Sequence, residues 1–357
     1  MTATAKVLNV GLIGYGFAGR AFHAPVIDAV PELKLAKVVE RRSEASKARY
    51  PWVTVVRDAG DLFSDPDIDL VVVATPSTDH VTFAREALLA GKHVVVEKPF
   101  VPTAAEADAL IELAKRQGLT LSVFQNRRWD GDFLTIRELL RQGRLGQLKA
   151  CEFRWDVFSP KASGNWRDRA GPGTGVWYDL GVHFLDQALC LFGMPESIRG
   201  DIATQRDGCG APDTFEVMLR YADGLQVKLG SSRFVRIASP RYALHGTLGS
   251  FVKYGVDPQE AALIEGRTPR ESGWGREPAD RYGRLNVSDG DLRFDGVIET
   301  LPGNYANFYR NVYEHIVGGA DLAVKPEEAR DAVRLVELAM RSSEEGRTIR
   351  VKDEWEG

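Results

Sequence analysis

The chain has 357 residues, and at about 150 residues per domain this length predicts two domains or one very large one. Its hydrophobic content of 44% and charged content of 27% are those of ordinary soluble domains, which argues against a disordered, collagen-like or coiled-coil protein. The 46 basic and 50 acidic residues leave a net charge of -4, so the charge balance does not favour a nucleic acid or an acidic membrane as a partner.

Neither a secretory leader nor a membrane span is expected. The stretch Met1–Lys6 precedes no long apolar run, and no window approaches the roughly 20 apolar residues that a span needs. Cys151, Cys190 and Cys209 lie far apart without a CxxC pair, which argues against a disulfide framework and a zinc knuckle. We therefore expect a cytoplasmic protein that does not bind a membrane.

The first third of the sequence alternates β-rich apolar runs with helical stretches. Strands are predicted at Val7–Ile13, Leu35–Val39, Leu70–Ala74, His93–Glu97 and Leu119–Val123. Helices are predicted between them at Ala18–Val30, Ser43–Tyr50, Thr82–Ala90 and Ala104–Gln117. This alternation is typical of βαβ units around a parallel sheet that is buried on both faces. We expect residues 1–124 to form a doubly wound α/β domain.

The pattern changes after a predicted linking helix at Asp132–Gln142. The β-rich runs that follow have no helices between most of them, and they lie at Leu148–Val157, Thr214–Tyr221, Gln226–Phe234, Tyr242–Gly246 and Ser250–Tyr254. The Asp223-Gly224 pair is typical of a hairpin turn. We expect residues 125–357 to form an α+β domain with an open antiparallel sheet.

Two helices are predicted near the end of the chain, at Asn307–Val317 and Pro326–Ser343. One face of the second helix is apolar, which predicts core packing for Ala332, Val333, Val336, Ala339 and Met340. The polar stretch Glu265–Arg281 predicts a surface loop. The open face of the second sheet should be apolar and covered by another copy of the chain, which predicts a homodimer or homotetramer.

The GYGFAG segment at 14–19 follows the first predicted strand and opens the first helix. In this context a GxGxxG pattern predicts a dinucleotide-binding turn, and the alternative is an ordinary glycine-rich turn. Gly14 allows the tight turn, Gly16 lets a pyrophosphate approach the backbone, and Gly19 lets the helix pack on the strand. The phosphates would meet the helix N-terminus, at Phe17 and Ala18, where free N–H groups and the helix dipole favour negative charge.

The end of the second predicted strand bears on which dinucleotide binds. A carboxylate at this point holds the ribose 2′-OH of NAD, whereas an arginine accommodates the 2′-phosphate of NADP. Glu40 fits NAD, and Arg41 and Arg42 fit NADP because guanidinium groups pair with phosphate in a bidentate manner. We expect NADP, with NAD as the alternative; a further interpretation makes both arginines solvated surface charges.

Glu97 and Lys98 follow the buried run Val94–Val96 at the carboxyl end of a predicted parallel strand. Ligands bind at this edge in open α/β sheets, so a lysine there would lie near a nicotinamide. A lysine at a strand end is in general more often solvated than catalytic. The neighbouring Pro99 and the position within the dinucleotide-binding domain favour a functional role.

A glycine-rich stretch at 171–175 leads into the segment WYDLGVHFLD, in which Asp179 and His183 stand four residues apart. On a helix this spacing places both side chains on one face. Histidine titrates near neutrality and carries protons in alcohol and carbonyl chemistry. A histidine on an apolar helix is otherwise a satisfied core residue, but the aspartate one turn away favours function. Asp186, on the next turn, fits a structural cap or pair.

Four ordered motifs resemble the glucose–fructose oxidoreductase, inositol dehydrogenase and rhizopine catabolism (Gfo/Idh/MocA) family, nearly end to end. They are GYGFAG at 14–19, TPSTDH at Thr75–His80, EKP at Glu97–Pro99 and WYDLGVHFLDQ at Trp177–Gln187. The segments NRRWD at Asn126–Asp130, YALHG at Tyr242–Gly246 and KYGVDPQE at Lys253–Glu260 further resemble the branch of NADP-dependent scyllo-inositol dehydrogenases.

The resemblance implies a Rossmann domain, a C-terminal α/β domain with an open antiparallel sheet, and an active site in the cleft between them. It implies that the EKP lysine is Lys98 and that Pro99 follows a cis peptide bond. By the same resemblance, the cofactor is bordered by Thr75, Pro76, His80, Glu97 and Lys98. Asp179 and His183 match the aspartate and histidine of the family's active-site helix.

The implied activity is the reversible oxidation of a secondary ring hydroxyl of a small polyol or sugar. In this hypothesis His183 takes the hydroxyl proton, Lys98 stabilises the developing alkoxide, and Asp179 orients the imidazole or binds a neighbouring hydroxyl. No metal is expected, because the six histidines are scattered and one Asp–His pair gives too few zinc ligands. The alternative is a cofactor-binding sensor or regulatory protein of the same fold without turnover.

Four further residues are candidates for the walls of the substrate site: Arg127, Trp129, Trp166 and Tyr242. A packing role is the alternative for each, since aromatic residues dominate cores and interfaces. The loop Gly164–Gly175 is a candidate lid.

Overall fold

A computed structural model describes residues 6–162, 164, 168–171 and 173–354, which divide into two units. The first unit comprises the chain up to Trp129 together with Pro258–Gly275 and Asn304–Arg330, and the second comprises the remainder. This division differs from the predicted boundary at 124/125 because two later segments return to the first unit. The Trp129 carbonyl, for example, accepts hydrogen bonds from the Asn304 amide at 3.1 Å and from Nε2 of Gln259 at 3.1 Å.

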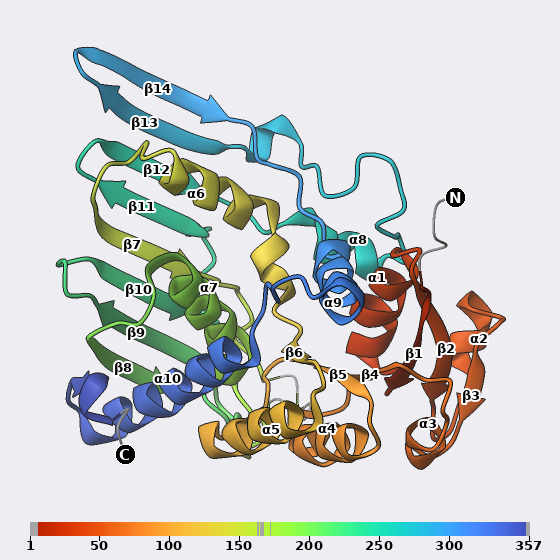
Figure 1. Ribbon diagram of the computed structural model, residues 1–357. Helices are drawn as coiled ribbons and strands as arrows, with labels where there is room; N and C mark the ends of the chain where they lie inside the picture. Colours follow the sequence, from red (N-terminus) through yellow and green to blue (C-terminus); the bar gives the residue numbers. More distant parts are fainter. Residues whose placement is uncertain (1–5, 163, 165–167, 172, 355–357) are drawn as a thin grey trace. The chain divides into compact units, whose positions relative to one another are not determined.

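The first unit contains a parallel sheet of strand order β3-β2-β1-β4-β5-β6 (Figure 1). Its strands are β1 (Leu8–Ile13), β2 (Leu33–Val39), β3 (Thr54–Val56), β4 (Leu70–Val73), β5 (His93–Val96) and β6 (Leu121–Val123). Strand β4 is fully buried along its length, as expected for a strand with both faces covered. The prediction of a doubly wound sheet is confirmed. The strands follow one another outward in chain order on both sides of the central pair β1 and β4.

The helices that accompany this sheet are α1 (Ala24–Asp28), which continues a π-helical turn at Gly19–His23, α2 (Ala45–Arg49), α3 (Gly60–Phe63), α4 (His80–Leu89) and α5 (Ala104–Gln117). Three of them, α2, α4 and α5, lie near their predicted limits. Helix α5 matches its prediction, because Thr103 and Glu106 form a capping box at its start and Gly118 ends it with φ 65°. Strand β3 and helix α3 were not predicted, since each is too short to show a period.

Two helices from the later segments complete the first unit, α8 (Pro258–Ile264) and α9 (Ala306–Gly318). Phe308 and Tyr309 of α9 pack against Phe124, with ring centroids 5.0 and 5.6 Å apart. Tyr309 also binds Nδ1 of the buried His23 through its hydroxyl group, at 2.6 Å. The hydrophobic core of this unit therefore joins the glycine-rich turn region to a helix almost three hundred residues later.

The second unit contains a sheet of order β14-β13-β12-β11-β7-β10-β9-β8-β15. Its strands are β7 (Leu148–Arg154), β8 (Ser197–Ala203), β9 (Thr214–Arg220), β10 (Gln226–Ser231), β11 (Tyr242–Gly246), β12 (Gly249–Lys253), β13 (Gly283–Asp289), β14 (Leu292–Ile298) and β15 (Ile349–Arg350). The predicted hairpin joins β9 and β10, with Gly224 at φ 86°. One pair departs from the antiparallel prediction, because β7 and β10 run parallel and the sheet is mixed. Strands β8, β13, β14 and β15 were not predicted.

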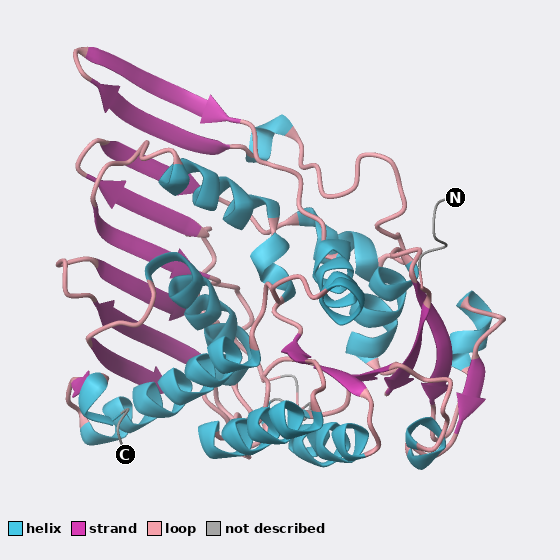
Figure 2. Cartoon of the chain, in the orientation of Figure 1, coloured by secondary structure: helices cyan, strands magenta, loops and turns pink. Residues whose placement is uncertain are grey.

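Helices cover one face of this sheet (Figure 2). They are α6 (Gly131–Arg141), α7 (Val182–Phe192) and the part of α10 (Pro326–Glu345) that belongs to this unit. The predicted stripe of α10 is in this core, where Ala332, Val333, Val336 and Ala339 are at most 2% exposed and Met340 packs against them. The core position of this stripe is confirmed.

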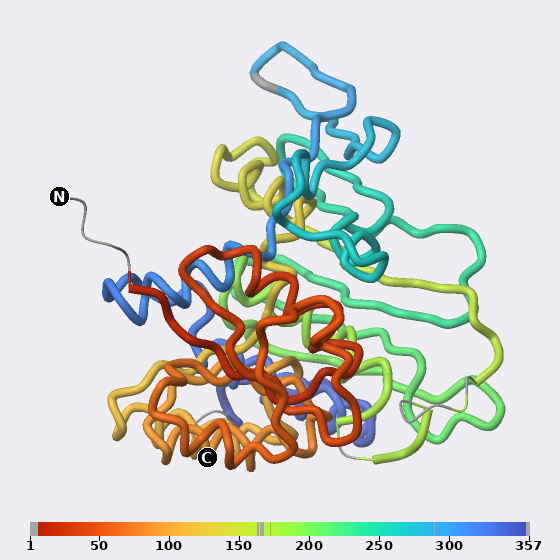
Figure 3. The backbone as a smooth tube through the Cα atoms, turned by 90° about the vertical axis from the view of Figure 1, so that its right-hand side faces the viewer, coloured from red at the N-terminus to blue at the C-terminus, as the bar shows by residue number. Residues whose placement is uncertain are grey.

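The opposite face of the sheet is polar, so the expectation of an apolar open face was wrong. Strand alternation turns Val227 and Leu229 inward and exposes the residue between them, Lys228, which is paired in register with Glu152 and Met218. Exposed apolar side chains instead gather on the edge strand β14, at Leu292, Phe294 and Val297. The hairpin β13–β14 stands out beyond the rest of its sheet in Figure 3.

None of the helices in the described ranges combines the length and the apolar composition that crossing a membrane requires.

Candidate active site

The glycine-rich turn after β1 has the geometry that a pyrophosphate requires. Gly14 adopts φ 95°, and a Cβ there would lie 2.8 Å from the Ala74 carbonyl oxygen, so only glycine fits. A Cβ at Gly19 would lie 2.0 Å from the carbonyl oxygen of Gly14, which shows how closely helix and strand approach. At Gly16, by contrast, a Cβ would meet no atom within 4 Å. The open space at Gly16, in front of the start of a helix, fits a dinucleotide phosphate.

Lys98 lies immediately after β5, at the carboxyl edge of the first sheet. The Lys98–Pro99 peptide bond is cis, as the resemblance implied. The buried Glu97 side chain accepts a hydrogen bond from the Lys98 backbone amide, and the Lys98 side chain is half-buried. The carboxyl end of β5 thus presents the cationic side chain of Lys98, and the Glu97 side chain holds the Lys98 backbone amide.

His80 joins the end of β4 to the segment that follows Lys98. Its Nε2 lies 3.0 Å from the Thr75 carbonyl, and its Nδ1 lies 3.0 and 3.1 Å from the carbonyls of Pro99 and Phe100. The ring is buried, and burial lowers the pKa of His80 although the three carbonyls act in the opposite direction. His80 therefore fastens two loops to each other, while Thr75 is half-buried and Pro76 exposed beside them.

The residues after β2 differ sharply in exposure. Arg41 and Arg42 are exposed, whereas the side chain of Glu40 is buried and bound to its own chain. Arg41 and Arg42 therefore occupy solvent-accessible positions at the carboxyl edge of the sheet that carries the glycine-rich turn, as the NADP prediction requires.

Asp179 and His183 lie in the second unit, on one continuous helical segment. Asp179 belongs to a π-helical turn at Trp177–Gly181, and His183 belongs to the first turn of α7. Glycine at position 181 lets the ring of Trp177 pack against this turn, because a Cβ there would lie 2.0 Å from the ring. Such π-helical turns are frequent at functional sites. His183 is buried and Asp179 is half-buried.

The sequence did not predict a role for two arginines beside this helix, Arg233 and Arg241. Burial lowers the pKa of Arg233, and the negative charge of Asp179 is the largest effect that opposes burial. Arg241 is 3% exposed, and its guanidinium carbon lies 4.5, 4.8 and 5.0 Å from the ring centroids of Trp155, Phe184 and Tyr242. A buried arginine at a strand end has no periodic signal in a single sequence, since arginine is usually exposed.

The described candidates for the substrate walls are engaged with their own units. Arg127 is buried and pairs with Glu260. Trp129 stacks edge-on against Phe308, with centroids 5.8 Å apart. Tyr242 is fully buried, and its hydroxyl group donates to Oε1 of Gln187 at 2.9 Å. Contact of these side chains with a substrate stays a prediction, and Trp166 lies outside the described residues.

The described part of the candidate lid is anchored at Asp168. The buried Arg206 donates to Asp168 at 2.8 Å and to Asp213 at 2.8 Å. The Asp168 side chain accepts from the Gly164 amide at 3.0 Å, and the Asp168 carbonyl accepts from the Gly210 amide at 2.7 Å. This network attaches the Asp168 segment to the β8–β9 connection, and movement of the loop as a lid stays a prediction.

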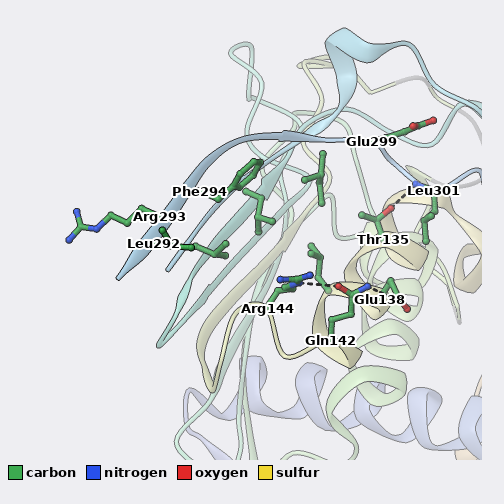
Figure 4. Close-up of a pocket in the computed structure, with 13 residues that line it drawn as sticks. Thr135, Glu138, Gln142, Arg144, Leu292, Arg293, Phe294, Glu299 and Leu301 are labelled. Carbon is green, nitrogen blue, oxygen red and sulfur yellow. Dashed lines mark hydrogen bonds between the residues drawn. The ribbon is translucent and has the colours of Figure 1, made fainter. Parts of the chain in front are cut away.

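A cavity of about 660 Å³ lies elsewhere in the second unit, between α6 and the hairpin β13–β14 (Figure 4). Leu292 and Phe294 line it from β14, and Thr135, Glu138 and Gln142 line it from α6. None of the predicted site residues lines this cavity.

Two profiles of one oxidoreductase family together match most of the chain. The profile "Oxidoreductase family, NAD-binding Rossmann fold" (GFO_IDH_MocA) matches residues 8–125, and the profile for the C-terminal alpha/beta domain of that oxidoreductase family matches residues 137–351. The uncharacterized oxidoreductase YdgJ of Escherichia coli is 42% identical over 96% of this chain and 98% of its own. The scyllo-inositol 2-dehydrogenase (NADP(+)) IolW of Bacillus subtilis is 40% identical over 96% of this chain and 95% of its own. The solved structure of YvaA from Bacillus subtilis aligns with a TM-score of 0.94 at 39% identity, covering 98% of this chain and 99% of that one.

Proposed function

Since the chain belongs to the Gfo/Idh/MocA oxidoreductase family, we propose that it transfers a hydride between NADP and a secondary hydroxyl group, or its ketone, on a cyclic polyol or sugar. The observation that carries the proposal is Lys98 at the carboxyl edge of the sheet whose glycine-rich turn fits a dinucleotide. The similarity to IolW supports a substrate of the scyllo-inositol type. The family makes the chain an oxidoreductase, and the substrate class is what we propose.

The mechanism assigns each polar group a task at the reacting carbinol. Bound dinucleotide supplies the hydride acceptor. The imidazole of His183 takes the proton from the substrate hydroxyl, and the ammonium of Lys98 stabilises the negative charge that develops on the oxygen. Asp179 orients the imidazole or binds a neighbouring hydroxyl. Lys98 belongs to the first unit and His183 to the second, so their meeting on one substrate is part of the proposal.

The buried and aromatic residues nearby have supporting roles in this proposal. Arg127, Trp129, Trp166 and Tyr242 form the walls of the substrate site, and apolar walls exclude water, which strengthens the electrostatic effect of the lysine. Thr75, Pro76 and His80 border the nicotinamide half of the cofactor.

Replacement of Lys98 tests the chemistry. Lys98→Met should lower turnover about 10²-fold or more, the usual size of a combined electrostatic and acid–base contribution, and should leave the dinucleotide Kd nearly unchanged. Steady-state rates and dinucleotide titration measure the two effects. Lys115→Met, on the exposed side of α5, is the matched control. Turnover that is unchanged in Lys98→Met rules out the assigned role.

The cofactor is tested by comparing NADP with NAD. The wild type should favour NADP, and the Arg41→Ala/Arg42→Ala variant should lose at least about tenfold in NADP affinity, because two charge-assisted contacts to phosphate are removed. Affinities for both dinucleotides measure this preference. A wild type that favours NAD reverses the assignment.

The substrate class is tested by measuring NADPH oxidation in the presence of each member of a panel of inososes, anhydro-sugars and dicarbonyl compounds. Turnover of a cyclic ketone supports the proposal. Tight dinucleotide binding with no turnover on any compound supports the alternative, a sensor or regulatory protein of the same fold.

A homodimer or homotetramer and a cytoplasmic location complete the proposal. Support for assembly comes from the exposed Leu292, Phe294 and Val297 on the edge strand β14, since edge strands with apolar side chains favour pairing. Sedimentation of a monomer contradicts this assembly. Support for the location is the absence of a disulfide among Cys151, Cys190 and Cys209, all within the described ranges.

A further inference from the structure

Glu40, at the end of β2, stands where a carboxylate would hold the ribose of NAD, yet its oxygens are already bound within the chain. Oε2 accepts hydrogen bonds from the Ser43 hydroxyl and, at 2.8 Å, from the Ala45 amide. Oε1 accepts from the Ser46 amide at 2.9 Å. The residue is 4% exposed. These donors include the first amides of α2, so the carboxylate closes the start of that helix.

The bound carboxylate has little capacity left for a ribose. An ionised carboxylate accepts about four hydrogen bonds, and the Glu40 side chain already accepts three. Burial raises the pKa of Glu40, but the hydrogen bonds, led by that of Ser43, outweigh burial and lower the pKa below its usual value. The group is therefore an anion held by its own chain.

Arg57 also forms hydrogen bonds to the segment that Glu40 holds. It follows β3, and its Nη1 donates to the Glu40 carbonyl at 2.8 Å and to the Ser43 carbonyl. Its Nη2 donates to the Glu44 side chain at 2.9 Å. The backbone on both sides of Arg41 and Arg42 is thus fixed, while these two arginines are exposed.

We infer that Glu40 is a positioning residue for cofactor selectivity: its carboxylate holds the 40–46 segment in the shape in which Arg41 and Arg42 bind a 2′-phosphate, and it does not bind the ribose. The inference rests on the proposed use of NADP. It reverses the sequence-based interpretation of Glu40 as the residue that fits NAD.

The two roles for Glu40 predict opposite changes in the selectivity of Glu40→Gln between NADPH and NADH. If the carboxylate positions the segment, the glutamine amide faces backbone N–H donors, the segment loosens, and NADPH affinity falls about tenfold with a smaller change for NADH. Loss of a negative charge near the phosphate would by itself strengthen NADPH binding, so a loss identifies positioning. If the carboxylate holds the ribose, NADH affinity falls more than NADPH affinity, and the inference is overturned; unchanged affinity for both overturns it as well.

Glu44→Gln is the matched control for charge. It removes a carboxylate four residues away, and the Arg57 bonds to the two carbonyls remain. Its NADPH affinity should stay within about twofold of the wild type. A loss as large as that of Glu40→Gln shows that the effect is not specific to the carboxylate of Glu40 and overturns the inference. Ser43→Ala removes one of the three donors and should show a smaller loss in the same direction, which serves if Glu40→Gln does not fold.

Hydrogen exchange without cofactor separates failure of this inference from failure of the proposed function. The amides of Ala45 and Ser46 should exchange at least about tenfold faster in Glu40→Gln, because their acceptor is weakened. Unchanged exchange overturns the positioning role whatever the wild type binds. If these amides exchange faster in Glu40→Gln but the wild-type protein favours NAD, the positioning role of Glu40 holds and the proposed cofactor is refuted.

Discussion

Gly16 and Gly19 share one motif but differ in what surrounds them. Space is open around Gly16, whereas Gly19 lies against the Gly14 carbonyl. The fold therefore requires glycine at position 19, whereas the space at Gly16 is open to a ligand.

This difference predicts opposite phenotypes for two alanine variants. Gly16→Ala should keep its stability within about 0.5 kcal/mol but weaken dinucleotide binding at least about tenfold, because the added methyl group occupies the space for the phosphates. Gly19→Ala should lose about 3 kcal/mol of unfolding free energy, since the methyl group would lie 2.0 Å from a backbone oxygen. Denaturant unfolding and dinucleotide titration measure the two effects. If Gly16→Ala binds the dinucleotide as tightly as the wild type does, the pyrophosphate does not bind at this turn.

The candidate residues were identifiable from the sequence where chemistry alone makes a residue type unusual. Lys98 beside Pro99 and the Asp179–His183 spacing stand out in this way, and the structure puts them on a strand end and a helix as predicted. Glu40 and His80 were identified but given cofactor contacts, and the structure adds internal bonds to each. Which partner a polar group finds depends on residues distant in the sequence, such as Pro99 for His80, and a local pattern does not contain them.

Among the elements, the loops after β4 and β5 depend on each other through His80. One loop carries Thr75, and the imidazole bonds to its carbonyl group. The other loop carries Lys98, and the imidazole bonds to the carbonyl groups of the two residues that follow the lysine. The position of the lysine therefore depends on a histidine that is buried away from solvent.

His80→Ala should separate turnover from binding. Loss of these bonds frees the Lys98 segment, so turnover should fall about tenfold or more and unfolding free energy by about 1–3 kcal/mol. The dinucleotide Kd should change less than about threefold if the ring touches only its own chain. Comparison of kcat, dinucleotide Kd and denaturant unfolding measures this, and a loss confined to dinucleotide affinity would instead make His80 a direct cofactor contact.

The elements with a clear period were predictable, and the short or exposed ones were not. Helix α5 and strand β11 match their predictions, because capping residues mark the helix and a short apolar run marks the strand. Strands β13 and β14 were not predicted either, and β3 and β15 have three and two residues, too few for a period. The parallel pairing of β7 with β10 is equally invisible locally, because pairing direction depends on the connection between strands.

In the molecule as a whole, the chain passes from one unit to the other more than once, and the second unit holds its returning segment with a buried ion pair. Lys253 of β12 donates to Glu277 at 3.1 Å, and the two side chains are 1% and 2% exposed. Asp132 is fully buried near this pair, and burial raises its pKa although Arg241 and Lys253 oppose the change.

Breaking the pair from one side should cost more than removing it. Lys253→Met leaves Glu277 buried without its cation, which predicts a loss of about 3–5 kcal/mol in unfolding free energy. Lys253→Met/Glu277→Leu should recover most of that loss, because Glu277 is no longer buried without its cation and Arg241 still acts on Asp132. The exposed pair Arg284–Asp295 is the control, and Arg284→Ala should cost at most about 1 kcal/mol. A double variant no more stable than Lys253→Met would show that the pair is not what holds the segment.

Hydrophobic period, glycine placement and short motifs are local properties of a chain, and they sufficed for the parallel sheet, the dinucleotide-binding turn and the family. They did not suffice for the division into units, the polar open face of the second sheet or the internal bonds of Glu40 and His80. Those features come from segments far apart in sequence that pack together, and buried polar groups then bond to whichever partners the packing supplies.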